Sequence, residues 1–256
     1  MIKTRFITAI AAVLVLTQLI SAQTPDADSV KAGDALRFDL GEGRSHTVSW
    51  FTRERDGVET TIQRVVTPVK VSGSPRLEVY TNTEIRQNKV LIQRRAEKRV
   101  YNASDMRPIT SRVDIEFIDG AALQTGWREL KYDGQRVQGA MIDQKQARRQ
   151  LDKELPADAL LVPYVAISFL QADQLELGRT VSFKTFNEES EAVEDGYIKV
   201  LKTEKISVAG ESYDALKVEM KVGRTTATAH YTATVPRILL RLRDNTRFME
   251  LTEMSK

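Results

Sequence analysis

The 256-residue chain contains no cysteine. This absence excludes a disulfide scaffold, a thiolate zinc site and a cysteine nucleophile, and it also excludes lipidation on an N-terminal cysteine. A domain exported without disulfides has to be stabilised by burial alone. It must therefore be long enough to form a sizeable core, and this chain is.

Histidine is also scarce. His46 and His230 are the only two, and neither stands in a metal-ligand spacing such as H-x-x-x-H. The chain has no G-x-S-x-G motif, which excludes a nucleophile elbow. An acidic stretch from Glu188 to Asp195 could offer oxygen ligands to calcium, but it lacks EF-hand spacing and is typical of a solvated loop. We therefore expect no catalytic residues, no metal and no cofactor.

The first residues have the three parts of a signal peptide, which we place at 1–22. Lys3 and Arg5 are positive, residues 7–16 are apolar, and Ala22 is a small residue at the expected cleavage site. The apolar run is short for a membrane-spanning helix, which needs about 20 residues. We expect a periplasmic or secreted protein with no permanent membrane anchor after cleavage; a retained anchor is the alternative.

Charge gives no support for a nucleic acid partner. The whole chain has a formal net charge of +3, and without Lys3 and Arg5 it has 36 basic and 35 acidic residues. A nearly neutral chain lacks the basic surface that nucleic acid binding requires. We therefore expect no nucleic acid partner.

Most of the chain has a strand pattern. After a polar lead-in at 23–45, we expect a single β-rich domain over 46–256. Alternating apolar and polar residues separated by turn residues predict roughly a dozen antiparallel strands. The predicted strands cover 46–50, 58–66, 76–81, 85–101, 112–118, 123–130, 136–142, 180–186, 192–208, 213–222, 225–234, 237–243 and 247–252. We expect breaks at Pro68 and at Asp195-Gly196.

The longest apolar run outside the signal segment is Leu160–Leu170. Periodicity alone cannot separate a buried helix from a buried strand. Pro163 favours a helix, because proline is tolerated at the first helical position. The helix would run to about Ala172 and would be buried, since it is apolar nearly all round. A buried strand is the alternative.

A second segment, 143–155, breaks the strand pattern. It is rich in Gln, Lys and Arg, and Leu151 and Leu155 lie four residues apart. This pattern predicts a short polar helix with Asp143 as its N-cap. The fold class expected from all elements is mainly β. It is a strongly curved antiparallel sheet, or an open half barrel, with one short buried helix and one polar helix.

The order of these segments resembles a known family. The resemblance rests on Asn102–Pro108, Arg112–Ile118, Lys131–Val137, the helix near 160–170 and Val208–Val218. It covers about 46–252 and is to a bacterial periplasmic family of unknown function, with a curved sheet similar to the outer-membrane lipoprotein carriers. Such carriers hold an apolar cavity in a half barrel lidded by helices. The resemblance implies that Tyr164, Ile167, Phe169 and Leu170 line or plug such a cavity.

Three aromatic residues fall on the predicted apolar faces of strands: Trp50, Phe117 and Trp127. Core packing explains them without a ligand. If part of that face is open, they would line an apolar cavity with the helix residues.

Arg237, Arg241 and Arg243 share strand parity. They predict a basic stripe that could contact lipid phosphates or another anionic partner. The alternative is a solvated sheet face in which the arginines pair with glutamates such as Glu219 and Glu250.

These observations favour a non-enzymatic, exported cell-envelope protein that binds an apolar or lipid-like ligand in a curved-sheet cavity. The alternative is a structural or interaction module with a fully packed core, whose partner is another envelope protein. An enzyme acting on glycan would need a pair of carboxylates in a cleft, and the sequence names no such pair.

Overall fold

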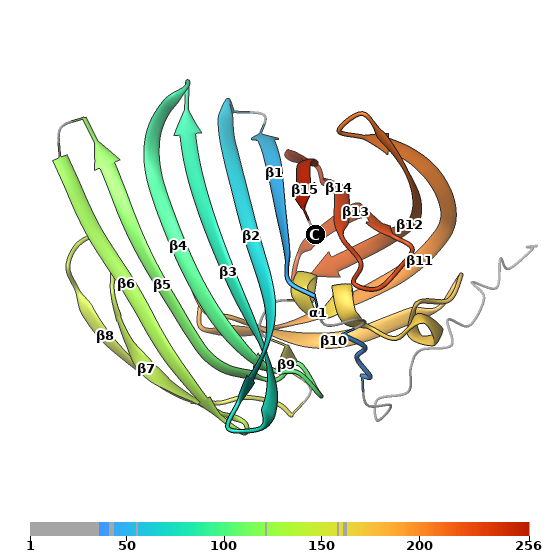
Figure 1. Cartoon of the computed structure of the whole chain (residues 1–256). Helices are drawn as coiled ribbons and strands as arrows, with labels where there is room; N and C mark the ends of the chain where they lie inside the picture. The colour runs from blue at the N-terminus through green and yellow to red at the C-terminus, as the bar shows by residue number, and fades with distance from the viewer. Residues whose placement is uncertain are drawn as a thin grey trace, which may run out of the picture.

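The structure is a computed structural model that describes residues 36–40, 44–54, 56–120, 122–157, 159–160 and 163–255. The predicted signal segment lies outside the described residues, as does most of the polar lead-in. The described part is one strongly curved open sheet around a short helix (Figure 1). Within that part, no helix is long and apolar enough to cross a membrane.

The sheet has fifteen strands in the order β8-β7-β6-β5-β4-β3-β2-β1-β15-β14-β13-β12-β11-β10-β9. Neighbouring strands are antiparallel except β9, which pairs parallel with β10. The strands are β1 His46–Glu54, β2 Val58–Val71, β3 Ser74–Gln87, β4 Val90–Asn102, β5 Pro108–Asp119, β6 Ala122–Asp133, β7 Arg136–Ile142, β8 Arg148–Glu154, β9 Ala159–Leu160, β10 Thr180–Asn187, β11 Ala192–Val208, β12 Glu211–Val222, β13 Thr225–Thr232, β14 Leu239–Arg243 and β15 Arg247–Ser255. The prediction of a mainly β, curved antiparallel sheet is confirmed.

The helix α1, Pro163–Phe169, lies between two parts of the core (Figure 1). Ile167 and Leu170 pack in a cluster with residues of β1 and β10–β15, whereas Val165 and Phe169 pack in a cluster with residues of β2–β4, β6–β8 and β10. Side chains three or four residues apart share one side of a helix, so the two pairs point to opposite sides. The buried helix was therefore predicted correctly, although it ends at Phe169 rather than Ala172. A 3₁₀ turn, Ala172–Leu175, follows it.

The predicted polar helix at 143–155 is wrong, because this segment forms the edge strand β8. Asp143 accepts hydrogen bonds from the backbone N–H groups of Lys145 (2.9 Å) and Ala147 (3.0 Å), so its side chain closes a turn and caps no helix. Leu151 is buried, while most of its neighbours in β8 are exposed. Charged residues suit an edge strand, because they discourage pairing with another chain.

Three predicted boundaries were also wrong. Pro68 lies inside β2, at a point beyond Val66 where β2 no longer pairs with β1, so its missing N–H is tolerated. The predicted strand 85–101 is split by a turn at Asn88-Lys89, where both φ angles are positive. Asp195-Gly196 makes no turn.

Gly196 is required by packing within β11 rather than by a turn. A Cβ atom at this position would lie 2.4 Å from the ring of Phe183 on β10, so only glycine leaves room for the aromatic side chain. The sequence alone does not distinguish this use of glycine from a hairpin turn.

The position of α1 between the two clusters gives a test by truncation. Ile167 is 2% exposed, so replacing it with alanine is expected to lower the free energy of unfolding by about 2–5 kcal/mol. Leu177→Ala is the matched control, because Leu177 is 69% exposed and should change stability by less than about 0.5 kcal/mol. Urea unfolding measures both variants. Equal losses would contradict the buried position of α1.

Candidate functional site

The end of α1 is held by an arginine that the sequence had placed on a surface stripe. The Arg237 side chain is buried and donates a hydrogen bond to the Leu170 carbonyl, and its backbone N–H donates to the Ser168 carbonyl (2.8 Å). A cation is favourable at the C-terminal end of a helix, where carbonyl groups lack helical partners. The predicted stripe is therefore broken at Arg237.

The other two arginines of the predicted stripe lie on β14. Arg241 pairs with Glu250 of β15 at 2.7 Å, as the paired alternative expects, and Arg243 is exposed. Glu219, the other expected partner, accepts a hydrogen bond from the Tyr197 hydroxyl at 2.7 Å. This surface therefore contains one paired and one exposed arginine.

A small cavity lies beside α1. Its lining comes from β1, β2, α1 and the segment before β14, and includes His46, Trp50, Arg64, Tyr164, Phe169 and Arg237. Its volume of about 20 Å³ is enough for roughly one ordered water or one small polar group. It cannot hold a whole lipid chain.

The predicted cavity residues separate into four places. Trp50, Tyr164 and Phe169 line the cavity, and the Trp50 indole N–H donates to the Leu239 carbonyl at 2.6 Å. Ile167 and Leu170 are buried in the core and are not among the residues that line the cavity. Phe117 is half-buried on β5, away from the cavity, and Trp127 lies on the opposite face of the sheet.

The face of the sheet can be assigned from the strand register. On β6 the residues that share the core face are Gly126, Arg128, Leu130 and Tyr132, all of them buried. Trp127 alternates with them, so it points away from the core. We call the core-bearing face the inner face. The sequence pattern favoured Trp127 as the inward residue, but the structure places Arg128 there.

Beyond α1, the inner face carries four half-buried apolar side chains: Ile62, Ile85, Ile115 and Phe117. We call them the apolar strip. Cross-strand pairing links Ile62 to Thr83, and Ile85 to Gln93 and then Phe117, so the strip spans β2 to β5. Of these four residues, only Ile62 packs against a core cluster in the described part of the chain. Strands β2–β6 extend well past α1 in this direction (Figure 1).

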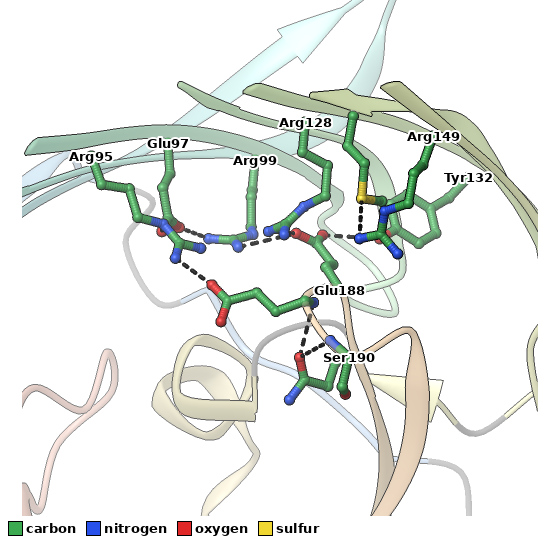
Figure 2. A network of polar contacts seen from close by, with 11 residues as sticks. Arg95, Glu97, Arg99, Arg128, Tyr132, Arg149, Glu188 and Ser190 are labelled. Carbon is green, nitrogen blue, oxygen red and sulfur yellow. Dashed lines mark hydrogen bonds and ion pairs between the residues drawn. The ribbon is translucent and has the colours of Figure 1, made fainter. Parts of the chain in front are cut away.

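Next to the strip, a polar network joins both ends of the sheet. Glu188 follows β10 and is 5% exposed. Its carboxylate accepts hydrogen bonds from Arg128 (2.6 Å) and the Tyr132 hydroxyl (3.0 Å) of β6, and lies 3.4 Å from Arg99 of β4 (Figure 2). The adjacent residue, Glu189, pairs with Arg95 of β4. The β10–β11 turn is thereby held against strands near the other end of the sheet.

The network extends to the edge strand β8. Lys153 donates to the Glu191 carbonyl, and Arg149 pairs with the Glu191 carboxylate at 3.0 Å. Since β8 is the last strand at one end of the sheet and β10 is next to last at the other, side chains bridge the two ends. No backbone ladder joins β8 to β9 or β10 among the described strands.

Charges balance in the part of the network formed by β4, β6, Glu188 and Glu189. Three arginines, Arg95, Arg99 and Arg128, meet the three carboxylates of Glu97, Glu188 and Glu189. Burial acts to raise the pKa of Glu188, but Arg99 and Arg128 outweigh it and hold that pKa below its ordinary value. Glu188 is therefore ionised at neutral pH. The expectation of a solvated acidic loop at 188–195 was wrong for Glu188.

Other combinations of titratable residues form no site. Among the residues that the structure describes, no group of three His, Asp or Glu side chains could hold a metal. His46 on β1 and His230 on β13 are separated by β15 and β14, so they share no site. His230 lies 3.1 Å from Glu204, and His46 lines the cavity.

The Glu188 contacts give a mutational prediction. Glu188→Gln leaves Arg99 and Arg128 buried without their shared anion, so the free energy of unfolding is expected to fall by about 3–5 kcal/mol. Glu189→Gln is the matched control, because that side chain is 63% exposed and its ion pair should contribute less than about 1 kcal/mol. Urea unfolding of both variants tests the difference. A loss in Glu188→Gln no larger than in the control would contradict a structural role for the buried carboxylate.

Stability should also depend on pH through Glu188. Its pKa is lower in the folded chain than in the unfolded chain, so its stabilisation is complete above the ordinary glutamate pKa of about 4.3 and is lost as the pH falls through the folded value. The difference in unfolding free energy between wild type and Glu188→Gln should therefore shrink in acid. A difference that stays constant down the acid range would contradict the lowered pKa.

Comparison with known proteins supports the fold. A crystal structure of a beta-barrel-like protein of the domain of unknown function DUF1849 from Brucella abortus matches with a TM-score of 0.50 and 9% sequence identity, over 82% of this chain and 97% of that one. No family model matches the chain, and no curated protein does. At this identity the likeness is one of fold, and the chain is similar to a β-rich protein whose function is unnamed.

Proposed function

We propose that this protein is a non-enzymatic, exported cell-envelope protein that binds an apolar or lipid-like ligand on the inner face of its curved sheet. The observation that carries the proposal is the apolar strip formed by Ile62, Ile85, Ile115 and Phe117. These side chains are only half-buried, although they lie on the face that elsewhere forms the core.

The surroundings of the strip support a binding role. Curved sheets bury ligands by closing around them, and apolar walls with a few placed polar groups are typical of such sites. Here the polar network fixes the spacing between β4–β6 and the β10–β11 turn. The strip therefore lies beside a part of the sheet that the polar network holds in place. A preorganised site loses less entropy when it binds a ligand.

A structural or interaction module is the second candidate. It is favoured by the small size of the cavity and by α1, whose two sides are already packed against core residues. On this proposal the inner face has no ligand, and an outer surface contacts another envelope protein. The two candidates differ in whether the strip takes up a small apolar molecule.

Tryptophan fluorescence can test the binding of an apolar chain. The sequence has only two tryptophans, so Trp127→Phe leaves Trp50, beside the cavity, as the single reporter. In that background, 1-decanol is expected to change the emission of Trp50 saturably. Phe117→Glu should weaken binding about 10-fold or more, because it removes a large apolar contact and introduces a charge.

The matched control for this experiment is Val90→Glu. Val90 is 64% exposed at the start of β4, and its substitution should leave the affinity for decanol unchanged. Lipids should also be recovered by extraction from protein purified out of its natural envelope. Failure of decanol to bind, together with the absence of extracted lipid, would favour the interaction module.

A further inference from the structure

One guanidinium on the inner face lies outside the balanced network. Arg64 is on β2, aligned with Thr81 of β3, and Thr81 is aligned with Glu97 of β4. Glu97, however, is bound by Arg95 and Arg99. Among the described residues Arg64 has no ion-pair partner, although many other arginines of this sheet have one.

Only part of the Arg64 guanidinium is engaged by contacts within the described part of the chain. Its Nε donates to the Thr81 hydroxyl at 3.3 Å, and its guanidinium carbon lies 5.2 Å from the centre of the Trp50 ring. These contacts fix the plane of the group. In the described part of the chain, its two terminal amino nitrogens have no acceptor, and the side chain lines the cavity beside α1.

Among the residues that the structure describes, the surroundings of Arg64 contain donors and the positive charge of Arg99 but no anion. Burial lowers the pKa of Arg64, yet a guanidinium stays protonated in proteins. Three phenols lie in its electrostatic surroundings, those of Tyr101, Tyr164 and Tyr231, and burial raises the pKa of each, so they are neutral. The hydroxyls of Tyr101 and Tyr231 are buried without a hydrogen-bond partner in the part that the structure describes. A partly buried cation without a counter-ion is unfavourable, so this environment is suited to an incoming anion.

We propose that Arg64 binds the carboxylate of an amphipathic acid whose chain lies along the apolar strip. Four N–H groups remain on the two terminal nitrogens, and two of them, one from each nitrogen, are parallel and match the two oxygens of a planar carboxylate. The cavity has room for about one small polar group, which fits a carboxylate better than a large headgroup. Ile62, the first residue of the strip, lies on β2 two residues from Arg64 and on the same face.

The position of the ligand's hydrocarbon chain rests on the proposed function, whereas the contact between its carboxylate and Arg64 does not. An acid bound at Arg64 would place its first carbons near Ile62 and its later ones towards Ile85 and Phe117. The ligand class is therefore a fatty-acid-like molecule rather than a neutral lipid. His46 lines the same cavity, and burial lowers its pKa, so its neutral ring adds no competing charge.

The experiment compares decanoate with 1-decanol at neutral pH, in the Trp127→Phe background described above. Decanoate is expected to bind about 10-fold or more tightly than decanol, because only the carboxylate can form a bidentate ion pair with Arg64. Arg64→Met should abolish this preference, so that decanoate and decanol bind with equal affinity. Arg64→Lys keeps the charge but not the paired N–H groups, and should retain only part of the preference. Arg243→Met, at an exposed arginine, is the matched control and should keep all of it.

A second readout uses a head group without a chain. His46 and His230 are the only histidines, so their ring signals in NMR spectra are easily distinguished. Acetate should shift the His46 signals in the wild type and not in Arg64→Met, while His230, far from the cavity, stays constant. Arg64→Met should fold, since removing an unpaired, partly buried cation is neutral or stabilising for the free protein. Thermal unfolding without ligand checks this point.

The outcomes separate the two proposals. Equal affinity for decanoate and decanol, with no effect of Arg64→Met, would overturn the carboxylate site but leave binding of an apolar chain intact. A His46 shift by acetate that depends on Arg64, with no decanol binding, would uphold the anion site and overturn the lipid-binding function. Absence of any response to all three probes would overturn both.

Discussion

The structure depends on a single buried carboxylate placed between two arginines. Glu188 bridges Arg99 and Arg128, and so connects the turn after β10 to strands β4 and β6. The sheet is thus closed around α1 by side chains, while its hydrogen-bonded order stays open. Buried ion pairs are sensitive to geometry, because desolvation is offset only when every partner is in place. Strict geometry is useful here, since it fixes how far apart the two ends of the sheet lie.

Much of this fold could be predicted from local sequence patterns. Alternation and Asp-Gly turns located most strands, and Pro163 identified the buried helix. The predictions were wrong where a local sequence pattern had a different structural cause. Leu151 and Leu155 are spaced as on a helix, but Leu151 is buried in the edge strand β8, which pairs with β7, and Leu155 is buried just after that strand. Gly196 resembled a turn residue, but it makes room for the ring of Phe183.

The site was harder to predict because its strands are polar on both faces. On β4, Arg95, Glu97 and Arg99 alternate with Arg94, Ala96 and Lys98, so alternation does not reveal the inner face. The sequence did contain one signal for the inner face. Tyr101, near the end of β4, lies on the same face of the strand as Arg95 and Arg99. On β6, the large apolar side chain of Trp127 favoured its own face of the strand as the inner face, whereas Arg128 on the other face is the residue that points inward. The partner of these arginines, Glu188, lies 89 residues from Arg99 and 60 residues from Arg128 along the chain, and no local pattern connects residues so distant in sequence.

Arg64 and Arg99 illustrate two ways of burying the same group. Arg99 is neutralised within the chain, so its burial contributes to a permanent closure. Arg64 has no such partner among the described residues, and the folded state bears the cost of its desolvation until an anion binds. A ligand that binds only the folded chain must stabilise it, by an amount that grows with ligand concentration over its dissociation constant. Affinity for an acid and stability of the ligand-free fold are therefore opposed at this position. A carboxylate of the chain placed beside Arg64 would stabilise the ligand-free fold, but it would also occupy the site and abolish the affinity for the acid.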